Sequence, residues 1–520
     1  MFFLIALALG AASAFSFQPV GWWPLMIVAI AALCELIARA GSLRQSLALG
    51  WAFGVGQFCI GLNWIATAFT FQAAMPAWLG WIAVVLLSLY LAVYPMLAVG
   101  LAWRFGHKNK LALVLALAGS WAITEWLRAT MFTGFAWNPM GASLVDTPLR
   151  EASRWIGTYG LSGITAVIGG SLWLAIGRQW RLLAILAVAS VLLWALPAPQ
   201  FTHSPLPVRK PAIDGDAGGV VVQRPIRIVQ PNIGQQDKWR PGFDEIASRR
   251  LDGLTIKGPP MERLVFWPEA AVTDPLQDER AGAAPLTETE RLEATRTLGA
   301  NDVLLTGGLS LTSSDGRTVD GATNSVYVLE PLGRIAGRYD KAHLVPYGEY
   351  LPMRPLLSAI GLSRLAPGDL DFAAGPGPRT VQLPGWWGRV GFQLCYEIIF
   401  SGEVVDRANR PDFIFNPSND AWFGRWGPPQ HLAQARLRAA EEGLPVVRST
   451  PTGISALIDA DGRLLNALPW KTAGVIDAML PDPRVPTLFA KLGNLIPLTL
   501  GFILLIVAIA LDRRARYRAI

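Results

Sequence analysis

Residues 78–102 read WLGWIAVVLLSLYLAVYPMLAVGLA and contain no charged side chain. They lie within a run of 59 residues, between Arg44 and Arg104, that has no Asp, Glu, Lys or Arg. A helix of about 20 apolar residues crosses the hydrocarbon core of a bilayer, whereas a soluble domain places charged residues on its surface. The stretch therefore predicts membrane-spanning helices.

Charged residues are unevenly distributed outside this stretch as well. They make up 16% of the 520 residues, which is below the roughly 25% of ordinary globular domains. Residues 1–197 carry 14 of the 83 charged side chains, and the other 323 residues carry the remaining 69. We therefore expect a membrane part and a water-facing part.

Eight apolar segments are long enough to be spans. They are residues 2–17, 21–38, 48–68, 78–102, 111–128, 157–177, 182–197 and 492–511. Residues 11–14 (AASA) resemble a signal-peptide cleavage site, but no Lys or Arg precedes the first segment, so an uncleaved anchor is favoured. The expected fold class is a polytopic α-helical membrane domain of about eight transmembrane helices. Seven would lie in 1–197, and the eighth, with a basic tail, in 486–520.

Basic residues in the short loops predict the orientation. Loops on the cytoplasmic side are rich in Lys and Arg. Alternate loops and the C-terminal tail carry such residues: Arg39 and Arg44; Arg104, Lys108 and Lys110; Arg178 and Arg181; Arg513, Arg514, Arg516 and Arg518. Both termini are expected in the cytoplasm and residues 198–491 in the periplasm. The net charge of +7 then reflects topology, not a nucleic-acid interface.

The segments outside the membrane differ in character. Residues 198–222 are rich in Pro and Gly and are expected to form a linker. Over 223–485, short apolar runs such as 226–229 and 390–394 alternate with helix-compatible stretches, which predicts a layered α/β domain. The long external loop 129–156 could pack under this domain or bind a lipid head group.

Three motifs place reactive side chains directly after predicted strands. Trp267-Pro268-Glu269 supplies a carboxylate, Asp340-Lys341 an ammonium, and Cys395-Tyr396-Glu397 a thiol. A nucleophilic thiol needs a base, and positive charge nearby favours its thiolate. Taken singly, Glu269 and Lys341 could form a surface ion pair, and Cys395 could be a buried core residue.

These motifs, in this order, resemble the Glu–Lys–Cys signatures of the nitrilase (carbon–nitrogen hydrolase) superfamily. Their insertion between the seventh and eighth predicted spans is similar to the apolipoprotein N-acyltransferases, a membrane-bound family of that superfamily. The resemblance implies an αββα sandwich, with Cys395 as nucleophile, Glu269 as general base and Lys341 as stabiliser of the tetrahedral intermediate. The supporting active-site residues that it implies are Glu349, Tyr396 and Glu397.

The resemblance also implies an activity. Acyl transfer would be ping-pong, through a thioester on Cys395, as the final step of bacterial lipoprotein maturation. The donor would be a phospholipid, phosphatidylethanolamine in particular, and the acceptor the free α-amine of the diacylglyceryl-cysteine of an apolipoprotein. The enzyme is expected to be a monomer in the bacterial inner membrane, with no cofactor and no nucleic-acid partner.

Two aromatic and apolar segments are candidates for lipid contact and for excluding water from the site, with ordinary core packing as the alternative. One contains Tyr350 and Leu351, and the other contains Trp422 and Phe423. By resemblance, Trp239 would line the acyl path. The family resemblance predicts an Asn-rich stretch after Arg448, but residues 449–453 read STPTG, and Pro451 lacks a backbone donor.

Other functions stay open at this point. A membrane-tethered amidase acting on a small C–N substrate would use the same three residues. A Cys–His hydrolase would use His343 or His431 instead. A transporter or binding scaffold leaves the three ordered motifs unexplained. No pair of Cys or His has the spacing of a metal site, so no metal is expected.

Overall fold

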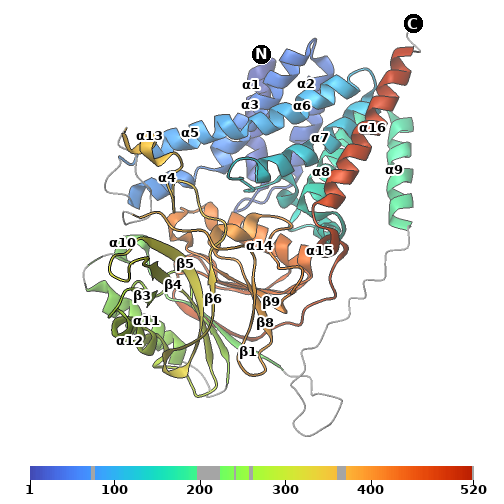
Figure 1. The fold of residues 1–520 in the computed structure, drawn as a ribbon. Helices are drawn as coiled ribbons and strands as arrows, with labels where there is room; N and C mark the ends of the chain where they lie inside the picture. Colours follow the sequence, from blue (N-terminus) through green and yellow to red (C-terminus); the bar gives the residue numbers. More distant parts are fainter. Residues whose placement is uncertain are drawn as a thin grey trace.

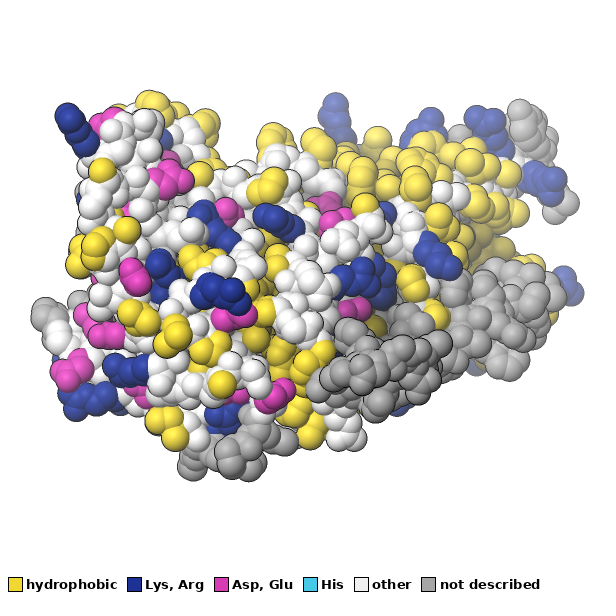
Figure 2. Space-filling model, turned by 60° about the horizontal axis from the view of Figure 1, so that its bottom comes forward, with side chains coloured by type: hydrophobic (Ala, Val, Ile, Leu, Met, Phe, Trp, Pro, Cys, Tyr) yellow, Lys and Arg dark blue, Asp and Glu magenta, His cyan; other side chains and the backbone are white. Residues whose placement is uncertain are grey.

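The computed structural model describes residues 1–71, 76–195, 223–238, 240, 242–256, 262–359 and 370–517. A bundle of helices lies beside an α/β part, and the chain returns to the bundle through its last helix (Figure 1). Charged side chains gather over the α/β part, whereas hydrophobic side chains cover much of the helical part at the upper right of Figure 2. The predicted linker 198–222 lies outside the described residues.

The helical part contains a helix, or a pair of helices, over each of the eight predicted spans. The helices are α1 (Phe2–Ser13), α2 (Pro24–Arg39), α3 (Leu43–Gly61), α4 (Ile65–Ala68), α5 (Leu79–Leu91), α6 (Val93–Gly106), α7 (Lys110–Thr130), α8 (Ser153–Ile176), α9 (Trp180–Ala195) and α16 (Leu495–Tyr517). By length and composition, four of the described helices could cross a membrane, or five if the bent pair 43–61 and 65–71 is one span. The count of eight stays a prediction, because α1 has only 12 residues and α2 and α9 have 16 each.

Small residues let the first helices of the bundle approach closely. A Cβ on Gly10 of α1 would lie 1.9 Å from the carbonyl oxygen of Phe53 on α3, and one on Gly56 would lie 2.1 Å from the carbonyl oxygen of Leu7. Such backbone contact is typical of helices that pack in a bilayer, where the surrounding lipid is as apolar as the side chains. Glycine is therefore required at both positions.

The α/β part has two sheets. The first has the order β13-β1-β2-β4-β5-β6, with β3 pairing β4, and the second has the order β12-β11-β10-β9-β8-β7. The strands of the first sheet are β1 (Pro225–Gln230), β2 (Leu264–Phe266), β3 (Pro275–Asp278), β4 (Val303–Thr312), β5 (Gly321–Glu330), β6 (Arg334–Asp340) and β13 (Gly474–Met479). Those of the second are β7 (Thr380–Gln382), β8 (Arg389–Phe392), β9 (Phe413–Pro417), β10 (Val446–Ser449), β11 (Ala456–Ile458) and β12 (Leu464–Ala467).

Helices cover the outer face of each sheet. Between the sheets, one core cluster joins Phe266 of the first sheet to Phe392 and Phe415 of the second. On the far side of the first sheet pack α11 (Phe243–Ile256) and α12 (Ala284–Thr295), and on the far side of the second packs α14 (Gly427–Glu442). This layering confirms the predicted αββα sandwich. The shorter helices of this part are α10 (Gln235–Lys238), α13 (Arg354–Ala359) and α15 (Leu488–Leu492).

Helix α14 faces the membrane helices and binds α8 through a buried carboxylate. Gly157 breaks the helical conformation of α8, with φ of +67°, so the N–H of Thr158 begins a new helical segment. Glu441 accepts this N–H at 2.6 Å and the Thr158 hydroxyl at 2.7 Å. It also pairs with Arg438 at 2.7 Å, and both side chains are buried. A carboxylate at a helix N-terminus is electrostatically favourable.

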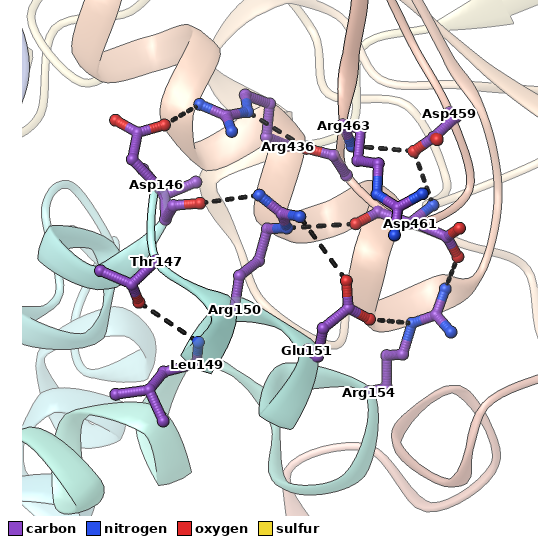
Figure 3. Close-up of polar contacts among 12 residues, drawn as sticks. Asp146, Thr147, Leu149, Arg150, Glu151, Arg154, Arg436, Asp459, Asp461 and Arg463 are labelled. Atoms are coloured by element: carbon purple, nitrogen blue, oxygen red, sulfur yellow. Dashed lines mark hydrogen bonds and ion pairs between the residues drawn. The ribbon is translucent and has the colours of Figure 1, made fainter.

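The loop 129–156 packs against the α/β part, as one of the two alternatives left by the sequence predicts, while binding of a lipid head group by this loop stays untested. Arg436 of α14 donates to Asp146 at 2.6 Å, and Arg150 donates to the carbonyl oxygen of Asp461 at 3.2 Å (Figure 3). Arg154 forms an ion pair with Asp461. Deeper in the interface, the indole of Trp137 donates to Gln430 at 2.8 Å. Polar contacts therefore hold the two parts together.

Replacing the carboxylate that joins the two parts should destabilise the protein. We expect Glu441→Gln to lower the free energy of unfolding by about 3 kcal/mol, because Arg438 loses its buried partner. Unfolding of the detergent-solubilised chain, followed by tryptophan fluorescence, measures this. The matched control is Glu245→Gln, which removes an exposed pair with Arg249 and should cost less than about 0.5 kcal/mol. Equal losses in the two variants would contradict the interpretation.

Candidate active site

Cys395 occupies a tight turn that follows β8. It begins a single 3-10 turn, Cys395–Ile399, and its φ of +53° lies in the left-handed region. A residue other than glycine rarely adopts this conformation unless its surroundings hold it there, and such strain gathers at functional sites. The side chain is buried.

Glu397 holds this turn against the loop that carries Lys341. One carboxylate oxygen accepts the N–H of Leu394 at 2.7 Å. The other accepts the N–H groups of Ala342 at 2.8 Å and His343 at 3.0 Å, and the hydroxyl of Tyr339 at 2.8 Å. A buried carboxylate with four donors is fully satisfied. Glu397 therefore positions the two loops relative to each other.

Lys341 follows β6 and is 1% exposed. Its ammonium lies 2.9 Å from Glu349. Glu349 also accepts the N–H of Val345 at 2.8 Å, which anchors the loop that it occupies. Lys341 and Glu349 thus form a buried ion pair, while the supporting role of Glu349 in the reaction stays a prediction.

Asn324 of β5 connects this pair to Glu269. Its amide nitrogen donates to Glu269 at 2.8 Å and to Glu349 at 2.8 Å. Glu269 itself follows β2 through Trp267 and Pro268 and is buried. Sequence reasoning missed Asn324, although the polar run Thr323-Asn324-Ser325 within an otherwise apolar strand was a signal.

The three predicted catalytic residues share one electrostatic environment. Burial raises the pKa of Glu269, which the charge of Lys341 opposes. Burial, and then the charge of Glu269, raises the pKa of the Cys395 thiol, and Lys341 lowers it. Burial alone would lower the pKa of Lys341, but Glu349 and Glu269 more than offset this and raise it. In the resting site the Cys395 thiol is therefore protonated and Lys341 is an ammonium. The raised pKa of Glu269 makes its carboxylate a stronger base, which suits a general base.

The two histidines contact backbone atoms instead of the thiol. His431 lies 3.0 Å from the carbonyl oxygen of Cys395 and 3.0 Å from Asp420, which pairs with Arg448 at 2.6 Å. His343 lies 2.8 Å from the carbonyl oxygen of Thr133. Both ring nitrogens of His431 and the Nε2 of His343 are engaged in this way, so neither residue is arranged as the base of a Cys–His hydrolase.

Three of the remaining predicted residues, Tyr396, Phe423 and Trp422, contact the helical part. The hydroxyl of Tyr396 donates to the carbonyl oxygen of Gly134 at 3.3 Å. Phe423 packs on Trp64 at 4.7 Å between ring centroids, and Trp422 packs on Phe71 at 5.8 Å. Leu351 is buried, and Tyr350 is partly buried. Trp239 lies outside the described residues.

A pocket of about 510 Å³ adjoins Glu269. Its lining includes Pro451, whose carbonyl oxygen accepts the N–H of Ile233 at 3.2 Å. The same pocket is lined by Lys238, whose ammonium donates to the carbonyl oxygen of Ala270 at 2.5 Å. Burial lowers the pKa of Lys238 to about 8, against the opposing charge of Glu269. Among the residues that the structure describes, no cluster of His, Cys, Asp and Glu is arranged to hold a metal ion.

The carboxylate of Glu397 should be the main stabilising group of the two catalytic loops. Glu397→Gln is expected to lower the free energy of unfolding by about 3 kcal/mol, because an amide nitrogen would face backbone donors. Tyr339→Phe removes only one of the four hydrogen bonds and should cost about 1 kcal/mol. Denaturant unfolding in detergent measures both, and a loss from Glu397→Gln no larger than that from Tyr339→Phe would contradict this role.

Comparison with known proteins identifies the family. A sequence model described as the apolipoprotein N-acyltransferase N-terminal domain matches residues 9–171, and one described as carbon–nitrogen hydrolase matches residues 261–485. Among solved structures, Nit3 of Saccharomyces cerevisiae, a member of branch 10 of the nitrilase superfamily, is 17% identical with a TM-score of 0.35. The match covers 53% of this chain and 95% of that one.

Two curated relatives match almost end to end. The apolipoprotein N-acyltransferase of Rhodopseudomonas palustris is 34% identical over 513 residues, which are 95% of this chain and 92% of its own. That of Bradyrhizobium diazoefficiens is 34% identical over 536 residues, covering 99% of this chain and 95% of its own. The chain therefore belongs to the apolipoprotein N-acyltransferase family of the nitrilase superfamily.

Proposed function

We propose that this protein transfers an acyl chain from a phospholipid to the free α-amine of the diacylglyceryl-cysteine of an apolipoprotein, through a thioester on Cys395. The observation that carries the proposal is the buried network linking Glu269, Asn324, Glu349 and Lys341, which acts electrostatically on the Cys395 thiol. The catalytic residues of the proposal are Glu269, Lys341 and Cys395.

In the first half-reaction, Glu269 takes the proton of the thiol, and the sulfur attacks the carbonyl carbon of the sn-1 ester. The tetrahedral oxyanion lies beside the Lys341 ammonium; a single such donor contributes about 3 kcal/mol to transition-state stabilisation. The C–O bond of the ester then breaks. Glu269 returns the proton to the leaving alkoxide, so the products are a lysophospholipid and the thioester.

In the second half-reaction, the α-amine of the acceptor attacks the thioester carbonyl carbon. Glu269 takes a proton from the attacking nitrogen as the C–N bond forms. The C–S bond breaks, and the proton passes to the thiolate, which regenerates Cys395 and releases the N-acylated lipoprotein. The ammonium of Lys341 again stabilises the oxyanion.

The thioester must persist between the two half-reactions without being hydrolysed. Phe423 and Trp422 pack on Trp64 and Phe71 of the helical part, which closes this side of the site with aromatic rings. Exposed apolar side chains at Tyr347, Met353 and Leu356 provide a surface suited to lipid. Both features favour a lipid donor over the small C–N substrate of an amidase, which would need neither.

The proposed location follows from the family and the apolar helices. We place the enzyme in the bacterial inner membrane, with the α/β domain in the periplasm and both termini in the cytoplasm, acting as a monomer. Reporter fusions at residue 520 and within 198–222 would test this orientation. Cytoplasmic labelling of the second fusion would contradict it.

Incubation with phosphatidylethanolamine should load an acyl group onto Cys395. Intact mass spectrometry of the purified protein is expected to show one adduct that hydroxylamine removes, because a thioester is cleaved under conditions that spare an amide. Cys59→Ala, which removes a partly buried thiol of α3, should retain the adduct, and Cys395→Ala should lack it. Hydrolysis of small amides without any lipid-derived adduct would favour the amidase instead.

The pH dependence of thiol alkylation tests the electrostatics directly. Since the charge of Glu269 raises the pKa of Cys395 and that of Lys341 lowers it, Glu269→Gln should move the alkylation profile to lower pH and Lys341→Met should move it to higher pH. Alkylation of Cys395 by iodoacetamide, mapped by peptide mass spectrometry across pH, measures both shifts. Movement of both profiles in the same direction would rule out the opposed effects.

A further inference from the structure

The pocket beside Glu269 contains a buried acceptor without a partner. Asn419, which is 8% exposed, lines this pocket and donates its amide N–H to Gln235 at 3.2 Å. Its side-chain oxygen has no hydrogen-bond partner among the described residues. Burial raises the pKa of the Cys395 thiol, and the backbone N–H of Asn419 acts against this rise, which places Asn419 near the thiol. An unsatisfied buried oxygen next to the nucleophile indicates a place for a ligand that donates hydrogen bonds.

The outer part of the same pocket is acidic. Besides Glu245, which pairs with Arg249, four further carboxylates line it: Asp244 of α11, Asp274 of the loop after Glu269, and Glu290 and Glu293 of α12. None of them forms an ion pair with a described residue, whereas the lining arginines Arg249 and Arg296 are paired with Glu245 and Asp252. Burial, and then the charges of Asp274, Glu293 and Asp244, raise the pKa of Glu290. Asp274, Glu293 and Asp244 therefore lie close enough to repel Glu290, and a cation would relieve this repulsion.

The pocket extends away from the membrane helices. It runs from Glu269, at the end of β2, to α11 and α12, which cover the outer face of the first sheet. The opposite layer of the sandwich, α14, is the one that packs on α8. In Figure 1, α11 and α12 accordingly lie at the side of the α/β part remote from the helical bundle.

We propose that this pocket binds the polypeptide that follows the modified cysteine of the acceptor, and that its carboxylates select a lysine or arginine side chain there. The inference rests on the proposed function. The acceptor's lipid chains stay in the bilayer while its α-amine reaches Cys395, so its polypeptide must leave the site in the direction away from the membrane. Asn419 would accept a hydrogen bond from the first peptide groups, and the four carboxylates would attract the cation.

Binding of diacylglyceryl lipopeptides to Cys395→Ala protein tests this without chemistry. Two fluorescent peptides would be compared, one with lysines and one with glutamines directly after the cysteine. The unaltered pocket should bind the lysine peptide about tenfold more tightly, with the preference falling as salt rises. In the triple change Asp244→Asn, Glu290→Gln and Glu293→Gln, the preference should fall below about twofold.

The control is Glu288→Gln, which removes one carboxylate of α12, as Glu290→Gln and Glu293→Gln each do, at a residue that does not line the pocket. It should retain the preference for lysine. An unchanged preference in the triple variant, or an equal loss in the control, would overturn the proposal. A second result would also overturn it: the triple variant forms the thioester more slowly when the donor is phosphatidylethanolamine but not when it is phosphatidylglycerol. The carboxylates would then bind the head group of the donor. Failure of the proposed function is a separate result, namely no thioester on Cys395 in unaltered protein.

Discussion

A buried ammonium is the constraint on which the arrangement of this site depends. Lys341 is almost fully enclosed, and an unpaired charge in such a place costs several kcal/mol. Glu349 supplies the first countercharge, and Asn324 ties Glu269 to the same group. Burial, and then the charge of Glu269, raise the pKa of the neighbouring Cys395 thiol against the effect of Lys341, so the thiol retains its proton. The charges that stabilise the buried ammonium of Lys341 therefore also influence the protonation of Glu269, the base, and of Cys395, the nucleophile.

The catalytic loops are also joined to the helical part. Tyr396, which follows Cys395, and His343, two residues after Lys341, form hydrogen bonds with the backbone of Gly134 and Thr133 in the segment after α7. The helix that follows this segment, α8, is bound to the α/β part as well, because the N–H of Thr158 donates to Glu441 of α14. The position of the reactive thiol relative to the helical part is thus defined by these hydrogen bonds together with an apolar cluster that the two parts share.

The sequence predicted those features that depend on local composition and short motifs. The charge-free run predicted the helical bundle, and the positions of Glu269, Lys341 and Cys395 after strands predicted where reactive groups would meet. It did not predict Asn324, or the contacts of Glu441 with Thr158 and of His431 with Cys395. His431 is 36 residues from Cys395 and Glu441 is 283 residues from Thr158. A single polar residue in a sequence does not indicate which distant residue it will contact. The number of true spans also needs more than hydropathy, because α1, α2 and α9 are short.

The left-handed backbone at Cys395 limits which nucleophiles this fold can use. With φ of +53°, the residue tolerates a single unbranched Cβ at a modest cost, whereas a β-branched side chain is a steric outlier in that region. Serine would therefore fit the turn in place of cysteine, but threonine would not. A variant of this fold with an oxygen nucleophile at position 395 would accordingly have to use serine. It would lose the thiolate, which is the good leaving group that lets an amine displace the acyl chain from the thioester.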